Sequence, residues 1–404
     1  MDKDIKRIRE LAKQWDELLH SEEQEEKRKA WTRLHDLKPL RPVCVIETDL
    51  MPDFVTEEEL LCEDAFLRET ERKMLYGIKH VTLIEDDYVL SRYYKQSYVV
   101  HSENADFGVG LQYEYRENQA VMPNHPIQDI DGLKKLKKRT FEVDRQASLR
   151  QKEFFDELFD GIIPVRMQLS DCNLPQLSRY AFDLIGMENM YFWMLDEPNA
   201  MHALVEYLKN DYIDRMKGYE KSGVLTLNNE NEYAGSGSYG YISGIKQTEG
   251  KKVFLKDMWV WLESQETDTV SPEMFSEFFL TAMSEIAELF HYTYYGCCEH
   301  LHDRFHLIEK KIKNIRCVSV SPWSDKEMMG ELIGKKYVYS AKASPQFISG
   351  ERADTAAQKI ELSSIYRSLQ DKKLVEYIYR DVYRYHGDAK KFNNWVSLVK
   401  NMYN

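Results

Sequence analysis

The sequence contains no run of 18 uncharged apolar residues, and it therefore predicts no membrane-spanning helix. It also lacks an excess of positive charge, because 55 lysines and arginines stand against 68 aspartates and glutamates, a formal net charge of −13. An acidic chain repels phosphate backbones and anionic lipid surfaces, which argues against nucleic acid and membranes as partners. The first ten residues, MDKDIKRIRE, lack the apolar run of a secretory signal peptide. We therefore expect a cytoplasmic protein.

Cysteine is scarce, with six residues among 404, and without a secretory signal these are expected to be thiols. Cys297 and Cys298 are adjacent, where a mutual disulfide would be strained. The sequence has no visible internal repeat or low-complexity linker. Apolar residues are abundant instead: 43% of the chain is hydrophobic and 12% is aromatic, enough to bury a large core.

Helix-like and strand-like segments alternate along the chain. Apolar residues at helical spacing over residues 5–20 predict a helical extension, which we assign to residues 1–40. Eight strands are expected beyond it, at residues 43–48, within 81–101, and at 165–168, 224–229, 258–263, 292–297, 315–321 and 336–341. Strands that alternate with helices imply parallel pairing with right-handed crossovers. The sequence therefore predicts an α/β fold, a (β/α)8 TIM barrel over residues 41–404.

The functional site of such a barrel lies where its strands end and the following loops meet. Polar residues follow most of the predicted strands, although any one of them could stand there simply because a loop begins. We expect catalytic roles for Glu263, Glu299, Asn229, Glu230 and Lys342, and substrate binding by Glu47, Asp49, Asp171, Ser264, Ser321 and Trp323. The Gly- and Ser-rich stretch AGSGSYGYISG (234–244) is expected to be a mobile loop.

The segment YYGCCEH carries the most specific chemistry in the sequence. Two thiols and a carboxylate in succession suit zinc, so Cys297, Cys298 and Glu299 are the predicted metal ligands. Adjacent strand residues point in opposite directions, so one of the cysteines could face away from the cavity. The alternative is that both cysteines are buried as small apolar side chains.

The segments YYGCCEHLHDRF, IKNIRCVSVSPWSD and KYVYSAKASP resemble those of the uroporphyrinogen decarboxylase superfamily. The similarity spans about residues 40–350 and is strongest over residues 257–345. That superfamily consists of (β/α)8 barrels. It includes decarboxylases of the heme pathway and zinc-dependent methyltransferases that serve corrinoid proteins.

Single positions separate the two branches. The decarboxylases carry Arg-Gln-Ala-Gly-Arg after the first strand, where this chain has Glu47-Thr48-Asp49-Leu50. Acidic residues at the mouth of the barrel would repel a substrate with eight carboxylates. The methyltransferases carry His-x-Cys after the sixth strand, where this chain has Tyr295-Gly296-Cys297; the cysteine matches and the histidine does not.

The resemblance thus implies a zinc-assisted methyltransferase that moves a methyl group between a small methylated substrate and a corrinoid. The sequence lacks the Asp-x-His-x-x-Gly pattern of corrinoid binding, so the corrinoid is expected on a separate protein. A homodimer is a possible assembly. The alternatives are a lyase that decarboxylates a porphyrinogen or another carboxylated substrate, and a non-catalytic barrel that binds a small molecule.

Overall fold

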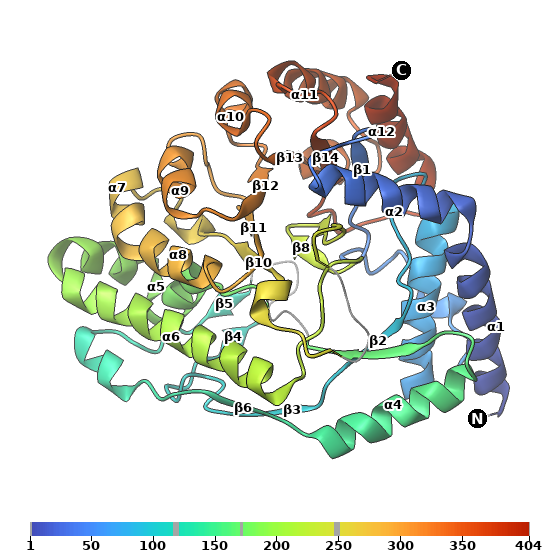
Figure 1. The fold of residues 1–404 in the computed structure, drawn as a ribbon, viewed down its shortest axis with the longest axis horizontal. Helices are drawn as coiled ribbons and strands as arrows, with labels where there is room; N and C mark the ends of the chain where they lie inside the picture. Colours follow the sequence, from blue (N-terminus) through green and yellow to red (C-terminus); the bar gives the residue numbers. More distant parts are fainter. Residues whose placement is uncertain (1, 116–120, 170–172, 246–250, 404) are drawn as a thin grey trace.

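The computed structural model describes residues 2–115, 121–169, 173–245 and 251–403. It has an α/β architecture in which helices surround centrally placed strands (Figure 1). The main sheet has six parallel strands in the order β1-β14-β13-β12-β11-β10. These strands are β1 (Val43–Ile46), β10 (Trp259–Leu262), β11 (Tyr292–Tyr295), β12 (Ile315–Val320), β13 (Val338–Ala343) and β14 (Val375–Tyr379).

A separate parallel pair is formed by β2 (Tyr94–Ser97) and β7 (Val165–Gln168). Within the described residues, no ladder of backbone hydrogen bonds joins this pair to the main sheet. The predicted closed barrel is therefore not confirmed. At both edges of the main sheet, side chains form hydrogen bonds with the backbone of the edge strand. The carboxylate of Asp87 accepts from the Cys44 N–H at 2.8 Å, and the Asn228 amide accepts from the Trp259 N–H at 2.9 Å and donates to its carbonyl at 3.0 Å.

The predicted set of strands needs two corrections. The expected strand at 224–229 is not a strand in the structure, because the Asn228 side chain replaces the backbone ladder to β10. Strand β14, which lies between β13 and β1, was not predicted. The other seven predicted strands overlap β1, β2, β7, β10, β11, β12 and β13.

Twelve α-helices lie outside the strands in the described chain (Figure 1). They are α1 (Asp2–Leu19), α2 (Glu22–His35), α3 (Ala65–Leu83), α4 (Arg145–Phe159), α5 (Leu177–Asp196), α6 (Pro198–Ser222), α7 (Pro272–Phe275), α8 (Thr281–Ala287), α9 (Phe305–Lys311), α10 (Lys326–Ile333), α11 (Thr355–Ser368) and α12 (Ala389–Asn401). None of these helices is long and apolar enough to cross a bilayer. The boundary at residue 40 between extension and main body stays a prediction.

Alternating strand residues belong to two different cores. On β1, Cys44 and Ile46 belong to the large core that also contains the helix side chains. Val43 and Val45 belong to an interior cluster with Trp31 of α2, Trp259 and Tyr294. Helix α2 therefore contributes directly to the interior, and α1 packs instead on α3 and α4 through a third cluster.

Three short antiparallel hairpins complete the fold: β3 (Val100–Glu103) with β6 (Thr140–Val143), β4 (Tyr113–Glu114) with β5 (Met122–Pro123), and β8 (Tyr233–Gly235) with β9 (Ser238–Tyr239). The β8–β9 hairpin falls in the segment that was expected to be a mobile loop. Residues 234–242 are buried instead, and Tyr239 and Tyr241 belong to the interior cluster. Small residues suit this place because they allow the hairpin to approach aromatic rings closely.

Gly235 gives a test of this close approach. A Cβ at Gly235 would collide with the Tyr294 ring and would lie 2.9 Å from Cγ of Trp261. We expect Gly235→Ala to lower the free energy of unfolding by about 1–3 kcal/mol, the usual cost of overpacking. Urea unfolding measures it, with Gly218→Ala as control: that α6 glycine faces open space, and the change should stabilise by about 0.5–1 kcal/mol. Equal effects of the two changes would contradict the packing.

Candidate functional site

A cavity of about 630 Å³, here called the thiol cavity, opens at the C-terminal ends of β10, β11 and β14. The residues that follow these strands line one side: Glu263, Gln265, Cys297, Cys298, Arg380 and Asp381. The other side is lined by Tyr113, Tyr115, Val121, Leu174, Gln176, Arg179, Tyr180, Asp183 and Trp261. The structure thus brings three predicted site residues, Glu263, Cys297 and Cys298, into one cavity.

The two adjacent cysteine thiols are in hydrogen-bonding contact with each other. Their Sγ atoms lie 3.7 Å apart, and Gly296, at φ +99°, turns the chain just before them. The hydrogen bond from the Cys297 thiol lowers the pKa of Cys298, and the nearby Arg380 guanidinium acts in the same direction against burial. The same hydrogen bond, together with burial, raises the pKa of Cys297 well above its usual value. Cys298 is therefore the more acidic thiol of the pair. All five described cysteines are free.

Glu263 is a buried carboxyl group at the wall of this cavity. Burial, and then the charges of Glu266 and Glu299, raise its pKa well above the usual range. A carboxyl group whose pKa is raised in this way keeps its proton to a higher pH, and in that form it can donate a hydrogen bond or a proton.

Glu299, Ser264 and Ser321 lie behind the cavity wall. The Glu299 carboxylate accepts hydrogen bonds from the backbone N–H groups of Ser264 at 3.1 Å and Cys297 at 2.9 Å. Ser321 donates its hydroxyl to the Glu299 carbonyl at 3.2 Å. These contacts fix the loop that carries the cysteines.

Arg380 and Asp381 are the site residues that sequence reasoning missed. Arg380 donates to the Ser236 hydroxyl at 2.6 Å, and its Nε lies 3.4 Å from Oε2 of Glu47. Burial raises the pKa of Glu47 to about 7, against the opposing effect of Arg380. The signal was present in VEYIYRD, where a buried run ends in charged residues just as the other strands do.

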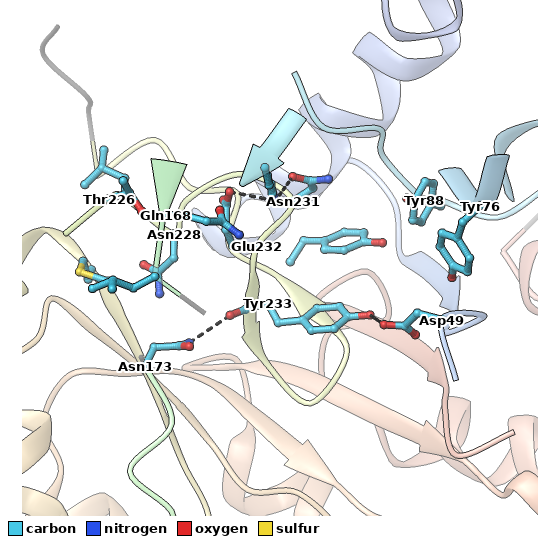
Figure 2. A pocket seen from close by; sticks show the side chains of 15 residues that line it. Asp49, Tyr76, Tyr88, Gln168, Asn173, Thr226, Asn228, Asn231, Glu232 and Tyr233 are labelled. Atoms are coloured by element: carbon cyan, nitrogen blue, oxygen red, sulfur yellow. Dashed lines mark hydrogen bonds and ion pairs between the residues drawn. The ribbon is translucent and has the colours of Figure 1, made fainter. Parts of the chain in front are cut away.

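A second cavity, of about 380 Å³, lies on the other side of the β8–β9 hairpin and is called the tyrosine cavity (Figure 2). Asp49, Tyr76 and Tyr88 line one end of it, and Gln168, Thr226, Asn228 and Glu232 line the other. Tyr233 and Tyr239 also line this cavity. Tyr233 donates its hydroxyl to Asp49 at 3.1 Å. Lys95 and Glu232 neutralise each other at 2.9 Å, so Asp49 is the lining carboxylate without a basic partner among the described residues.

Lys342 was predicted to be catalytic but lies in the interior beneath the hairpin. It donates to the Ser236 carbonyl, the Tyr294 hydroxyl and the Ser340 hydroxyl at 2.7–2.8 Å. Burial lowers its pKa to about 8. Lys342 lines neither cavity.

The remaining predicted residues are dispersed. Asn229 donates its amide to the Ile245 carbonyl at 2.8 Å, and Glu230 pairs with Arg92 at 3.6 Å. Trp323 is 58% exposed and lines neither cavity. Asp171 lies outside the described residues.

One group in the described chain brings three metal-ligating side chains together. The ligand atoms of His35, Cys317 and Glu376 all lie within 4.8 Å of one another, so this buried triad could bind a metal ion. The predicted ligands Cys297, Cys298 and Glu299 form no such group in the part of the chain that is described, because the Glu299 carboxylate binds backbone N–H groups instead.

Comparisons with known proteins identify the fold. No protein-family model matches the sequence, and no curated protein matches it. Among solved structures, a methyltransferase from Methanosarcina mazei superposes with a TM-score of 0.51 over 94% of this chain and 99% of its own. The two sequences are 11% identical, so this likeness shows a shared fold.

Proposed function

We propose that this chain is a methyltransferase that moves a methyl group between a small methylated substrate and a separate corrinoid protein. The observation that carries the proposal is the Cys297–Cys298 pair, which opens onto a cavity of substrate size beside Glu263, a buried carboxyl group with a raised pKa. The fold shared with a methyltransferase supports the same reaction class.

Glu263 is the residue to which we assign proton transfer. As the methyl–heteroatom bond breaks, the heteroatom keeps the electron pair and takes the proton from Glu263, while the methyl group passes to the acceptor on the partner protein. The Cys298 sulfur and Arg380 would orient the substrate in the cavity. Buried acids of this kind contribute about 10²–10⁴-fold to a rate.

Zinc held by Cys297, Cys298 and Glu299 is not supported by the arrangement of these residues. Two thiols supply soft ligands, but both Glu299 oxygens accept from backbone N–H groups, and Arg380 places a positive charge beside the sulfurs. As arranged, the three residues do not fit a zinc ion. The proton transfer by Glu263 is independent of a metal at this position.

The tyrosine cavity is an alternative binding site for a methylated substrate, and because Glu263 does not line it, methyl transfer there would not use that acid. Aromatic rings bind methylated ammonium groups through cation–π interactions, and a carboxylate nearby adds charge complementarity. Tyr88, Tyr233 and Tyr239 provide the rings, with ring centroids 6.0–6.2 Å apart, and Asp49 provides the carboxylate. Methylamines and methoxy-aromatic compounds are therefore the first substrates to test.

The test is methyl transfer from a panel of methylated amines and methoxy-aromatics to purified corrinoid proteins. We expect Glu263→Gln to lower the rate by about 10²-fold or more, since the acid proton is lost. Cys62→Ser serves as the control, because Cys62 is buried by α1 and α3, outside both cavities. Absence of transfer from every donor would contradict the proposal, and release of CO₂ from a porphyrinogen would establish the lyase instead.

A further inference from the structure

We propose that His35, Cys317 and Glu376 form a metal site for one zinc-like divalent ion in the interior of the protein. His35 is the last residue of α2, Cys317 lies on β12, and Glu376 lies on β14. All three are fully buried and lie apart from the Cys297–Cys298 pair. The proposal does not depend on the proposed methyltransferase activity.

The distances between the ligand atoms suit a tetrahedral ion. Metal–ligand bonds of about 2.0–2.3 Å in a tetrahedron place neighbouring ligand atoms about 3.3–3.7 Å apart. Nε2 of His35 lies 3.5 Å from Oε2 of Glu376, and Sγ of Cys317 lies 3.4 Å from Oε1 of the same carboxylate. Imidazole, thiolate and carboxylate are all established zinc ligands. The Ser238 hydroxyl, 3.5 Å from the His35 Nε2, or a water molecule can supply the fourth ligand.

The orientation of His35 is fixed in the form that a metal requires. Its Nδ1 lies 2.9 Å from the Tyr241 carbonyl, and because a carbonyl can only accept, Nδ1 carries the proton. Nε2 is the ring nitrogen that faces Glu376, and Ser238 donates its hydroxyl to that carboxylate at 2.8 Å. A metal ion, or a second proton on the imidazole, can join Nε2 to the carboxylate, and elemental analysis distinguishes the two.

The surroundings of the triad resemble those of a closed structural site. The His35 ring packs against Trp31 at 5.8 Å and Trp259 at 5.3 Å between ring centroids, which excludes solvent. Lys342, the nearest buried ammonium, donates to Ser236, Ser340 and Tyr294, so its hydrogen bonds leave the three ligands free. The thiolate and carboxylate together balance a divalent charge.

Such an ion would join α2 to two strands of the main sheet. Because an unfolded chain lacks a preformed site, the free energy of metal binding adds to the stability of the folded protein. We therefore expect a stabilising role for this metal, at the opposite end of β12 and β14 from the thiol cavity.

The experiment uses the full chain, purified after expression in zinc-supplemented medium. We expect close to one metal ion per chain by elemental analysis, and a thiolate charge-transfer absorption after replacement with Co²⁺. Cys317→Ser and His35→Gln should each lose at least nine-tenths of the metal. Cys44→Ser, which alters another buried sheet cysteine, and the double variant Cys297→Ser/Cys298→Ser should keep it.

Folding of each variant is checked by circular dichroism, and His35→Gln serves where Cys317→Ser does not fold. A strong chelator should lower the melting temperature of the wild type and leave that of folded His35→Gln unchanged. Wild-type protein that is folded without metal, and whose melting temperature does not rise with added Zn²⁺ or Co²⁺, would overturn the proposal; a proton would then bridge His35 and Glu376. Retention of full metal by both triad variants would overturn it equally.

Discussion

Replacing Arg139 with methionine is expected to lower the free energy of unfolding by about 3–5 kcal/mol, the cost of leaving a buried charge without its partner. Arg139 donates to Oδ2 of Asp211 at 2.9 Å through Nε and at 2.5 Å through Nη2, and both side chains are more than nine-tenths buried. Its guanidinium also lies 4.0 Å from the Phe107 ring centroid and 5.0 Å from that of Tyr180. The residue therefore fastens the segment before β6 to helix α6.

Two further variants separate the charge effect from lost packing. Lys138→Met removes an adjacent ion pair to Asp214 on the same helix, but both partners are more than half exposed, so the loss should be much smaller than that from Arg139→Met. The double variant Arg139→Met/Asp211→Leu should recover most of the stability, because no buried charge then remains. Urea unfolding measures all three. Similar losses from Arg139→Met and Lys138→Met would contradict the buried-pair explanation.

The sequence predicted most strands because their apolar runs are bounded by clear turn signals. Residues 224–229 show the limit of that signal: VLTLNN is as apolar as a buried strand, yet Asn228 bonds to Trp259 through its side chain. An apolar run of this kind indicates that a segment is buried. Whether the segment pairs as a strand depends on whether a neighbouring strand offers it free backbone N–H and C=O groups. The β14 run VEYIY was missed because the charged residue Glu376 interrupts its apolar pattern, although this side chain is fully buried.

The candidate site was predictable only where it follows the strand pattern. Glu263, Cys297 and Cys298 follow predicted strands and share the thiol cavity. Arg380 follows the strand that was missed, so its pair with Glu47 could not be foreseen. His35 and Cys317 belong to segments far apart in the sequence, and only the packing of one face of α2 against the interior cluster brings them together.

Glu47→Gln is expected to change how stability depends on pH. Burial raises the folded-state pKa of Glu47 from 4.5 to about 7, with Arg380 opposing and Asp49 adding to the shift. Between these two values the folded protein holds a proton that the unfolded chain has lost, so wild-type stability falls as pH rises through this window. The shift corresponds to about 3 kcal/mol. Glutamine cannot titrate, and the variant should therefore gain about 3 kcal/mol relative to wild type between pH 4.5 and 7.5.

The relevant quantity is the difference in unfolding free energy between variant and wild type, measured by urea at half-unit steps of pH. Other buried acids, such as Glu263, titrate in both proteins and cancel in that difference. Glu59→Gln is the matched control: burial would raise the pKa of Glu59, but hydrogen bonds from Lys79 and the backbone of Thr56 hold it below its usual value. Its variant should lose stability relative to wild type as pH rises. If the Glu47→Gln difference stays flat from pH 4.5 to 7.5, Glu47 is ionised throughout this range and Arg380 fully compensates its burial.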